Sequence, residues 1–329
     1  MSFFYQPWGA ALGKLRGLSA HRRKNLKRKH FTVVACALFV LATPCRALEQ
    51  SWPAGARAAV SLAYDDALDS QLDHALPALN RVGLKASFYL QLSSPGIRVR
   101  LPEWRAAARA GHELGNHTLF HQCSSAKPDR AWVVAQRDLH TTTVAQMKDQ
   151  VTLANSMLHA IDGLHERTFT VPCGDERASG QNYLPAIASE FLAIKSGAAA
   201  AGVPFKIIDP YAVPVVVPVG LSGRQLIELV KQAGERDALL NLTFHGIGGD
   251  YLTVSAEAHA ELLAFLAANR HVYWTDTFLN IMKYVKGKQA TAAAKLSRPL
   301  SGSIYDGNIR YLACCPPTPP IRPRALAQP

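Results

Sequence analysis

The chain has 329 residues, enough for one large domain or two ordinary ones, and its 48% hydrophobic content excludes a globally disordered protein. The formal charge is +12, but residues 1–47 hold nine Lys and Arg and no acid, and residues 286–329 hold seven against one. Residues 48–285 therefore carry 20 basic and 23 acidic side chains. Because this body has no excess of positive charge for a phosphate backbone, nucleic-acid binding is not expected.

Residues 1–47 have the layout of an N-terminal extension followed by a secretory signal peptide. A basic block at 21–30 precedes an uncharged, mostly apolar run at 31–43, and small residues stand at the −3 and −1 positions if cleavage follows Ala47. The apolar run is shorter than the ~20 residues of a membrane-spanning helix, so a retained anchor is the lesser alternative. We therefore expect export to the periplasm or the outside, with no stable membrane span after the signal is removed.

Residues 48–285 alternate short apolar runs with stretches of helical period. Runs typical of buried strands lie at 58–64, 86–90, 168–171, 191–194, 213–219, 238–244 and 272–274. Helical spacing appears at 72–79, 104–110, 138–161, 226–230 and 256–267. This repetition favours an α/β fold with a parallel sheet, closed or nearly closed as a barrel. The pattern stops at Lys286, so the Ala/Pro-rich basic segment 286–329 is predicted to be a disordered tail.

Two polar groups follow predicted strands early in the chain. Asp65 and Asp66 come directly after the first strand, where one carboxylate can ligate a cation while the other accepts a proton; a helix N-cap or a solvated turn is the alternative. His117 and His121 are spaced i and i+4, which on a helical turn would let them share a cation, unless they are unrelated histidines. One Asp and two His would leave open positions for water and substrate, as a catalytic metal site requires.

A third polar site is His245, between the predicted strand 238–244 and a glycine-rich loop. A histidine in this place is well positioned to transfer protons, and a capped strand end is the alternative. The order and spacing of the three sites, rather than any one of them, indicate an active site.

Four segments resemble the motifs of one enzyme family, the NodB-homology polysaccharide deacetylases (carbohydrate esterase family 4). Residues 60–66 (VSLAYDD) resemble its first motif, and residues 117–121 (HTLFH) match its His-Ser/Thr-x-x-His motif in full. Residues 170–174 (TVPCG) resemble a degenerate third motif, and residues 242–245 (LTFH) resemble the final one. The resemblance implies a distorted (β/α) barrel of about seven parallel strands, forming a single catalytic domain at 48–285.

The resemblance also implies roles for individual residues. Asp66, His117 and His121 look like ligands of one divalent metal ion, with zinc the first choice and cobalt, manganese or nickel as alternatives. Asp65 resembles the catalytic base and His245 the catalytic acid, and the backbone N–H of Cys173 would hold the oxyanion.

Three departures from the family pattern concern residues that support the site. Thr170 stands where the third motif has an arginine that orients the base, and Arg177 is the candidate replacement. The fourth motif has no clear counterpart, and Asp209 is the nearest candidate for orienting the histidine. Ala67 replaces the usual glycine after the two aspartates.

Cys123 and Cys173 are the only cysteines of segment 48–285. In the implied barrel both lie on loops at the metal-bearing rim, and export supplies an oxidising compartment. We therefore predict a disulfide between them; the alternatives are two independent buried thiols or, less favoured, a thiolate metal ligand.

The implied activity is hydrolysis of acetyl groups, N-acetyl in the first place, from a polysaccharide or oligosaccharide. This is the work of a hydrolase acting on non-peptide carbon–nitrogen bonds. One alternative is a hydrolase of the same fold that acts on a small amide or an O-acetyl ester. The other is an inactive carbohydrate-binding relative, which the absent arginine would permit.

Overall fold

The computed structural model describes residues 51–199 and 201–297, so the predicted signal peptide and most of the predicted tail lie outside the described residues. Its strands are β1 (Ala58–Asp65), β2 (Ser87–Leu90), β3 (Glu113–Asn116), β4 (Thr168–Thr170), β5 (Arg177–Ala178), β6 (Gln181–Asn182), β7 (Ala193–Ala198), β8 (Val203–Pro204), β9 (Val213–Val215), β10 (Ala238–Phe244) and β11 (Tyr273–Asp276). Its α-helices are α1 (Leu76–Val82), α2 (Pro95–Arg109), α3 (Val144–Asp162), α4 (Leu184–Ile187), α5 (Gly223–Glu235), α6 (Ala256–Ala268) and α7 (Phe278–Leu296).

Seven parallel strands form the barrel. They pair in the order β10-β1-β2-β3-β4-β7-β9, and the segment after β9 returns to β10 through the parallel bridge between Val216 and Leu242. The barrel is distorted because β11 pairs with the first half of β1 while β2 pairs with its second half. β8 adds a short antiparallel pairing to β10. The predicted fold is thus confirmed.

β1 is buried along its whole length, which explains why it reads as a continuous apolar run rather than an alternating one. Its even-numbered residues, from Ala58 to Tyr64, pack in the larger core cluster together with residues of α1, α5 and α6. Ala59 and Ala63 belong to a second cluster, with Tyr89 of β2 and Ala193 of β7. Because side chains alternate along a strand, Asp65 continues the row of Ala59 and Ala63.

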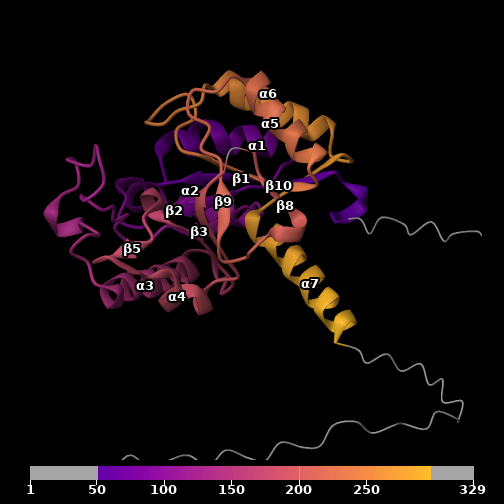
Figure 1. Cartoon of the computed structure of the whole chain (residues 1–329). Helices are drawn as coiled ribbons and strands as arrows, with labels where there is room; N and C mark the ends of the chain where they lie inside the picture. The colour runs from indigo at the N-terminus through magenta and orange to yellow at the C-terminus, as the bar shows by residue number, and fades with distance from the viewer. Residues whose placement is uncertain (1–50, 200, 298–329) are drawn as a thin grey trace, which may run out of the picture. The chain divides into compact units, whose positions relative to one another are not determined.

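The helices cover the outside of this sheet. Figure 1 shows α1, α5 and α6 together on one side and α3 with α4 on another, in agreement with the contacts of these pairs. Capping boxes begin α3 at Thr143 and α5 at Ser222, and α3 ends at Gly163 in the left-handed conformation. No helix within 51–199 or 201–297 is long and apolar enough to cross a membrane.

Two elements, α7 and β3, differ from the sequence predictions. The helix α7 runs to Leu296, so residues 286–296 are helical and do not belong to a disordered tail. Its first half carries Phe278, Ile281 and Met282 into the second core cluster, a period that the sequence analysis overlooked. β3 was not predicted, because its four residues, ELGN, include a glutamate, a glycine and an asparagine.

Candidate active site

A cavity of about 780 Å³ lies at the carboxyl ends of the barrel strands. All five side chains that the sequence analysis singled out for chemistry line it, namely Asp65, Asp66, His117, His121 and His245. They come from the ends of β1, β3 and β10, which lie far apart in the sequence but share one rim of the barrel. This is the rim at which (β/α) barrels carry their active sites.

The two histidines sit on a loop after β3, not on the helical turn that their spacing suggested. Thr118 and His121 both have positive φ angles, of 66° and 51°. The Asn116 side chain accepts from the Thr118 N–H at 2.8 Å, and the Thr118 hydroxyl accepts from the His121 N–H at 2.9 Å. Asn116 and Thr118 therefore shape the loop that brings the rings together, with centroids 4.7 Å apart.

Asp66, His117 and His121 converge on one point. The Asp66 Oδ1 atom lies 3.2 Å from His117 Nε2 and 3.0 Å from His121 Nε2, and the three ligand atoms lie within 4.8 Å of one another. The Asp66 side chain reaches this point because its backbone leaves β1 with a φ of 83°, followed by Ala67 at 58°, where the family pattern has glycine.

The protonation of these groups fits a bound cation. His117 Nδ1 donates to the Thr170 carbonyl at 2.9 Å, so in the neutral ring the Nε2 atom carries a lone pair toward Asp66. Burial alone would lower the pKa of His117, but the Asp65 and Asp66 carboxylates raise it above its ordinary value. Two imidazoles and a buried carboxylate that converge on one point are a donor set suited to a divalent metal.

Asp65 faces into the barrel beside the metal-type triad. Its Oδ2 atom lies 4.0 Å from His117 Nε2, and its Oδ1 atom lies 3.7 Å from the Nζ atom of Lys195. Lys195 is fully buried on β7 and lines the cavity. The sequence analysis missed it, although it follows the predicted strand at 191–194 just as Asp65 follows the first strand.

His245 also lines the cavity. Its Nε2 atom lies 3.7 Å from Asp66 Oδ2, and its buried Nδ1 atom has no hydrogen-bond partner within the described part of the chain. Burial lowers the pKa of His245, against the opposing effect of Asp65 and Asp66. The Tyr251 hydroxyl, which the sequence analysis did not single out, donates to Asp66 Oδ2 at 2.8 Å.

The two predicted supporting residues do not reach the site. Arg177 is exposed on β5, where its guanidinium donates to the Gly180 carbonyl at 3.0 Å. Asp209 is also exposed, and its carboxylate accepts from the Tyr211 N–H at 2.9 Å. Sequence proximity to the third motif was misleading for Arg177, because a turn separates it from β4, and Asp209 lies on a surface loop.

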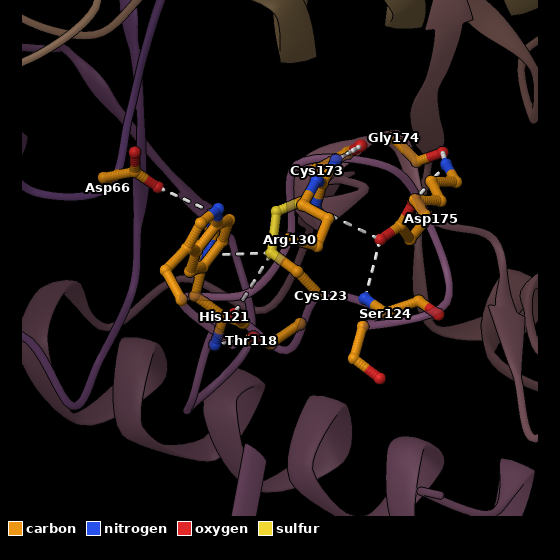
Figure 2. Close-up of a disulfide and its surroundings, with 12 residues drawn as sticks. Asp66, Thr118, His121, Cys123, Ser124, Arg130, Cys173, Gly174 and Asp175 are labelled. Atoms are coloured by element: carbon orange, nitrogen blue, oxygen red, sulfur yellow. Dashed lines mark hydrogen bonds and ion pairs between the residues drawn. A yellow bond between two sulfur atoms is a disulfide. The ribbon is translucent and has the colours of Figure 1, made fainter. Parts of the chain in front are cut away.

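The structure joins Cys123 and Cys173 by a disulfide, with Cα atoms 5.7 Å apart (Figure 2). The Cys123 sulfur lies 3.6 Å from His121 Nδ1, so the bridge borders the triad. Asp175 ties the same two loops together, because it accepts from the Ser124 N–H at 2.8 Å and pairs with Arg130 at 3.4 Å. The loop that carries His121 is thus fastened to the loop that carries Cys173.

The Cys173 backbone lines the cavity in an unusual conformation. Its φ of 57° is left-handed, it lines the cavity, and its N–H donates to no group in the ranges that the structure describes. Arg130 donates to the Cys173 carbonyl at 3.3 Å, which fixes the orientation of this turn.

Comparisons with known proteins were made for sequence and for fold. Residues 54–187 match the family model described as polysaccharide deacetylase. A search of curated proteins found no match. A solved structure from Mycobacterium smegmatis, assigned to the polysaccharide deacetylases, aligns with a TM-score of 0.53 and 15% identity, over 72% of this chain and 93% of that one.

Two further solved structures align with lower scores. The family 4 esterase domain of a xylanase from the hindgut metagenome of Trinervitermes trinervoides has 16% identity and a TM-score of 0.46, over 70% of this chain and 92% of its own. A family 4 acetyl xylan esterase from Clostridium thermocellum, in complex with cobalt, has 18% identity and a TM-score of 0.45, over 69% and 91%.

The matched segment 54–187 contains Asp65, Asp66, His117, His121 and Cys173, and it ends before Lys195 and His245. The fold of the Mycobacterium smegmatis structure extends the likeness across the barrel. The likeness to the polysaccharide deacetylases thus rests on a family model over residues 54–187 and on a shared fold over most of the barrel.

Proposed function

We propose that this protein is an exported, metal-dependent hydrolase that removes acetyl groups, N-acetyl in the first place, from a polysaccharide or oligosaccharide. The observation that carries the proposal is the convergence of Asp66, His117 and His121 on one point, with Asp65 and His245 beside it in a single cavity. The export signal at 1–47 is a sequence prediction and enters the proposal as such.

Asp66, His117 and His121 would hold one divalent ion, zinc by preference because two imidazoles and a carboxylate suit it, with cobalt, manganese and nickel as alternatives. Such an ion polarises a carbonyl and acidifies water when it is bound. The Tyr251 hydroxyl occupies Asp66 Oδ2, which leaves Oδ1 directed at the histidines.

The remaining steps belong to the side chains and backbone of this chain. Asp65 would take the proton of the attacking water, because its carboxylate lies beside the triad and inside the cavity. The Cys173 N–H would donate to the oxyanion of the tetrahedral intermediate. Burial favours the neutral form of His245 in the free protein, so the ring would first take up a proton from solvent. It would then give this proton to the leaving amine.

The aromatic side chains at the mouth of the cavity support a sugar substrate. Trp132 and Tyr251 line the cavity and are 60% and 52% exposed, so both present aromatic surface that a sugar ring can contact. An O-acetyl ester remains the second candidate substrate, because the same base, oxyanion donor and acid serve an ester as well as an amide.

Acetate release tests the proposal. Purified protein is incubated with N-acetylated chitooligosaccharides, peptidoglycan and O-acetylated xylan, before and after chelation and after zinc or cobalt is restored. We expect release from at least one glycan, its loss with the metal, and its return with metal. Release that survives complete metal removal contradicts the proposal, and metal binding without release from any acetylated substrate favours an inactive carbohydrate-binding relative.

A further inference from the structure

We propose that Lys195 is the positioning residue for the base Asp65, supplied from β7 in place of the arginine that the third motif lacks here. The inference rests on the proposed function, because it assigns a partner to the base of that reaction. It adds a residue that lies outside the segment matched by the family model, which ends at residue 187.

The strand register explains how one cation can replace another. Thr170, at the position of the motif arginine, is the direct partner of Lys195 across the β4–β7 pair. Paired residues of parallel strands lie at the same level and point to the same face. Lys195 therefore stands one strand away from the usual origin of the cation, at the same height in the barrel.

The face to which Lys195 points is the interior. Along β7, Ala193 belongs to the cluster that contains Ala63 and Tyr89, whereas Ile194 packs in the separate cluster under α3 and α4. Lys195 has the same parity as Ala193, so it points the same way. Asp65 has the parity of Ala63 on β1, and the two side chains meet across the interior.

The contacts of the ammonium group hold it in one place. Nζ lies 3.7 Å from Asp65 Oδ1, donates to Thr243 Oγ1 at 3.2 Å, and lies 3.8 Å from the centre of the Tyr89 ring. Burial lowers the pKa of Lys195 to about 8, against the pull of the Asp65 and Glu113 carboxylates, so the group remains charged at neutral pH. A buried cation with these neighbours leaves Asp65 few alternative orientations.

The contact is specific to one oxygen of the base. Asp65 Oδ1 is buried, makes no hydrogen bond to any described residue and forms an ion pair with Lys195, whereas Oδ2 faces the metal-type triad. Lys195 thus holds the oxygen that does not face the reacting water, and a carboxylate held on one side presents its other oxygen in a defined direction.

Lys195→Met tests this assignment, because it removes the charge and keeps the length of the side chain. With the substrate that wild-type protein deacetylates, we expect kcat to fall by about 10²-fold, since misplacement of a reacting group costs rates of that order. KM should stay within about threefold and bound metal per chain should be unchanged, because Lys195 does not touch the three ligand side chains.

Rescue distinguishes positioning from a structural role. In the Lys195→Met background, Thr170→Arg returns a cation from β4, and we expect it to recover kcat at least about tenfold. Lys195→Arg should likewise exceed Lys195→Met. Lys283→Met is the matched control, because Lys283 pairs with Glu166 outside the cavity, and its kcat should stay within about twofold of wild type.

The outcomes are separable. If Lys195→Met loses thermal stability but its folded, metal-loaded fraction keeps the wild-type kcat, the positioning role is wrong while the proposed function stands. If the wild-type protein releases no acetate, the proposed function fails first. If Lys195→Met does not fold, Thr243→Val removes only the hydroxyl that receives the ammonium, and unchanged kcat in that variant overturns the inference.

Discussion

The two sides of the cavity are built in different ways. On the cation side, Asp66, His117 and His121 come from two short segments whose residue types and spacing follow the family motifs. On the base side, Asp65 pairs with Lys195 of β7, which belongs to none of the four motif segments and whose ammonium donates to Thr243 of β10. Residues that would contact the metal or the substrate follow local sequence motifs. Residues that position them can come from any neighbouring strand.

We expect the largest loss of metal and of activity when a side chain of the cation side is removed. His121→Ala removes one of three ligand atoms, so we expect bound zinc to fall below about 0.1 per chain at micromolar protein and acetate release to fall to background. Metal analysis after gel filtration measures the bound zinc, and an acetate assay measures the release of acetate. Full metal occupancy in this variant would mean that the triad is not the site. His140→Ala, an exposed histidine, is the control.

A slightly smaller loss is expected on the base side. Asp65→Asn keeps the shape of the side chain and cannot take a proton, so turnover should fall by about 10²–10⁴-fold, the range of general acid–base groups. The metal content should equal that of wild type. If Asp65→Asn loses the metal instead, the division of roles between Asp65 and Asp66 is wrong, and the two sides of the cavity are not independent.

His245→Ala should reduce turnover by at least about 10²-fold with little loss of metal, because its assigned task is proton donation. Its ring lies 3.7 Å from Asp66 without being one of the three converging ligands. Tyr251→Phe is an informative companion: it removes only the bond to Asp66 Oδ2 and should weaken metal affinity rather than proton transfer. Turnover within threefold of wild type in His245→Ala would exclude the acid role.

The disulfide links the two loops that carry His121 and the Cys173 N–H. Cys123→Ser together with Cys173→Ser should lower the free energy of unfolding by about 4 kcal/mol, because the bridge closes a 50-residue separation. Urea unfolding measures this, and non-reducing peptide mapping of the wild-type protein should find the two cysteines joined. Free thiols at both positions would contradict the bridge.

The smallest expected effect of any single group concerns two buried histidines that do not line the cavity. Burial lowers the pKa of His112 and of His259 to about 4 from 6.5, so the unfolded chain binds more protons than the folded one between these values. Stability should therefore be full above pH 6.5 and fall as the pH drops through 4, by on the order of 3 kcal/mol per histidine.

Urea unfolding of metal-free protein at pH 7, 5 and 4 measures this loss. His112→Asn should make the pH dependence shallower, and His271→Gln, which changes an exposed histidine, should leave it unchanged. Equal slopes for wild type and His112→Asn would mean that His112 is not a source of the pH dependence.

The sequence predicts the barrel, five polar side chains of the cavity and the bridge between Cys123 and Cys173. The apolar runs and helical periods that predict the barrel are local properties of the sequence. The segment HTLFH contains Thr118, whose hydroxyl holds the loop between the two histidines. The sequence analysis overlooked β3 and α7, since ELGN has little strand propensity and α7 is amphipathic for only part of its length. It misplaced the histidine pair on a helical turn, because spacing alone does not reveal positive φ angles.

Which residues support Asp65 depends on how the strands pair in the folded protein. Arg177 is close to the third motif in sequence but lies exposed on a separate hairpin, whereas Lys195 is 25 residues beyond Thr170 and is its direct partner across β4 and β7. Which strand lies beside which, and in what register, follows from the packing of the intervening helices against the sheet. A charge can therefore reach the same point in the barrel from either strand, and the distance along the chain does not reveal which strand provides it.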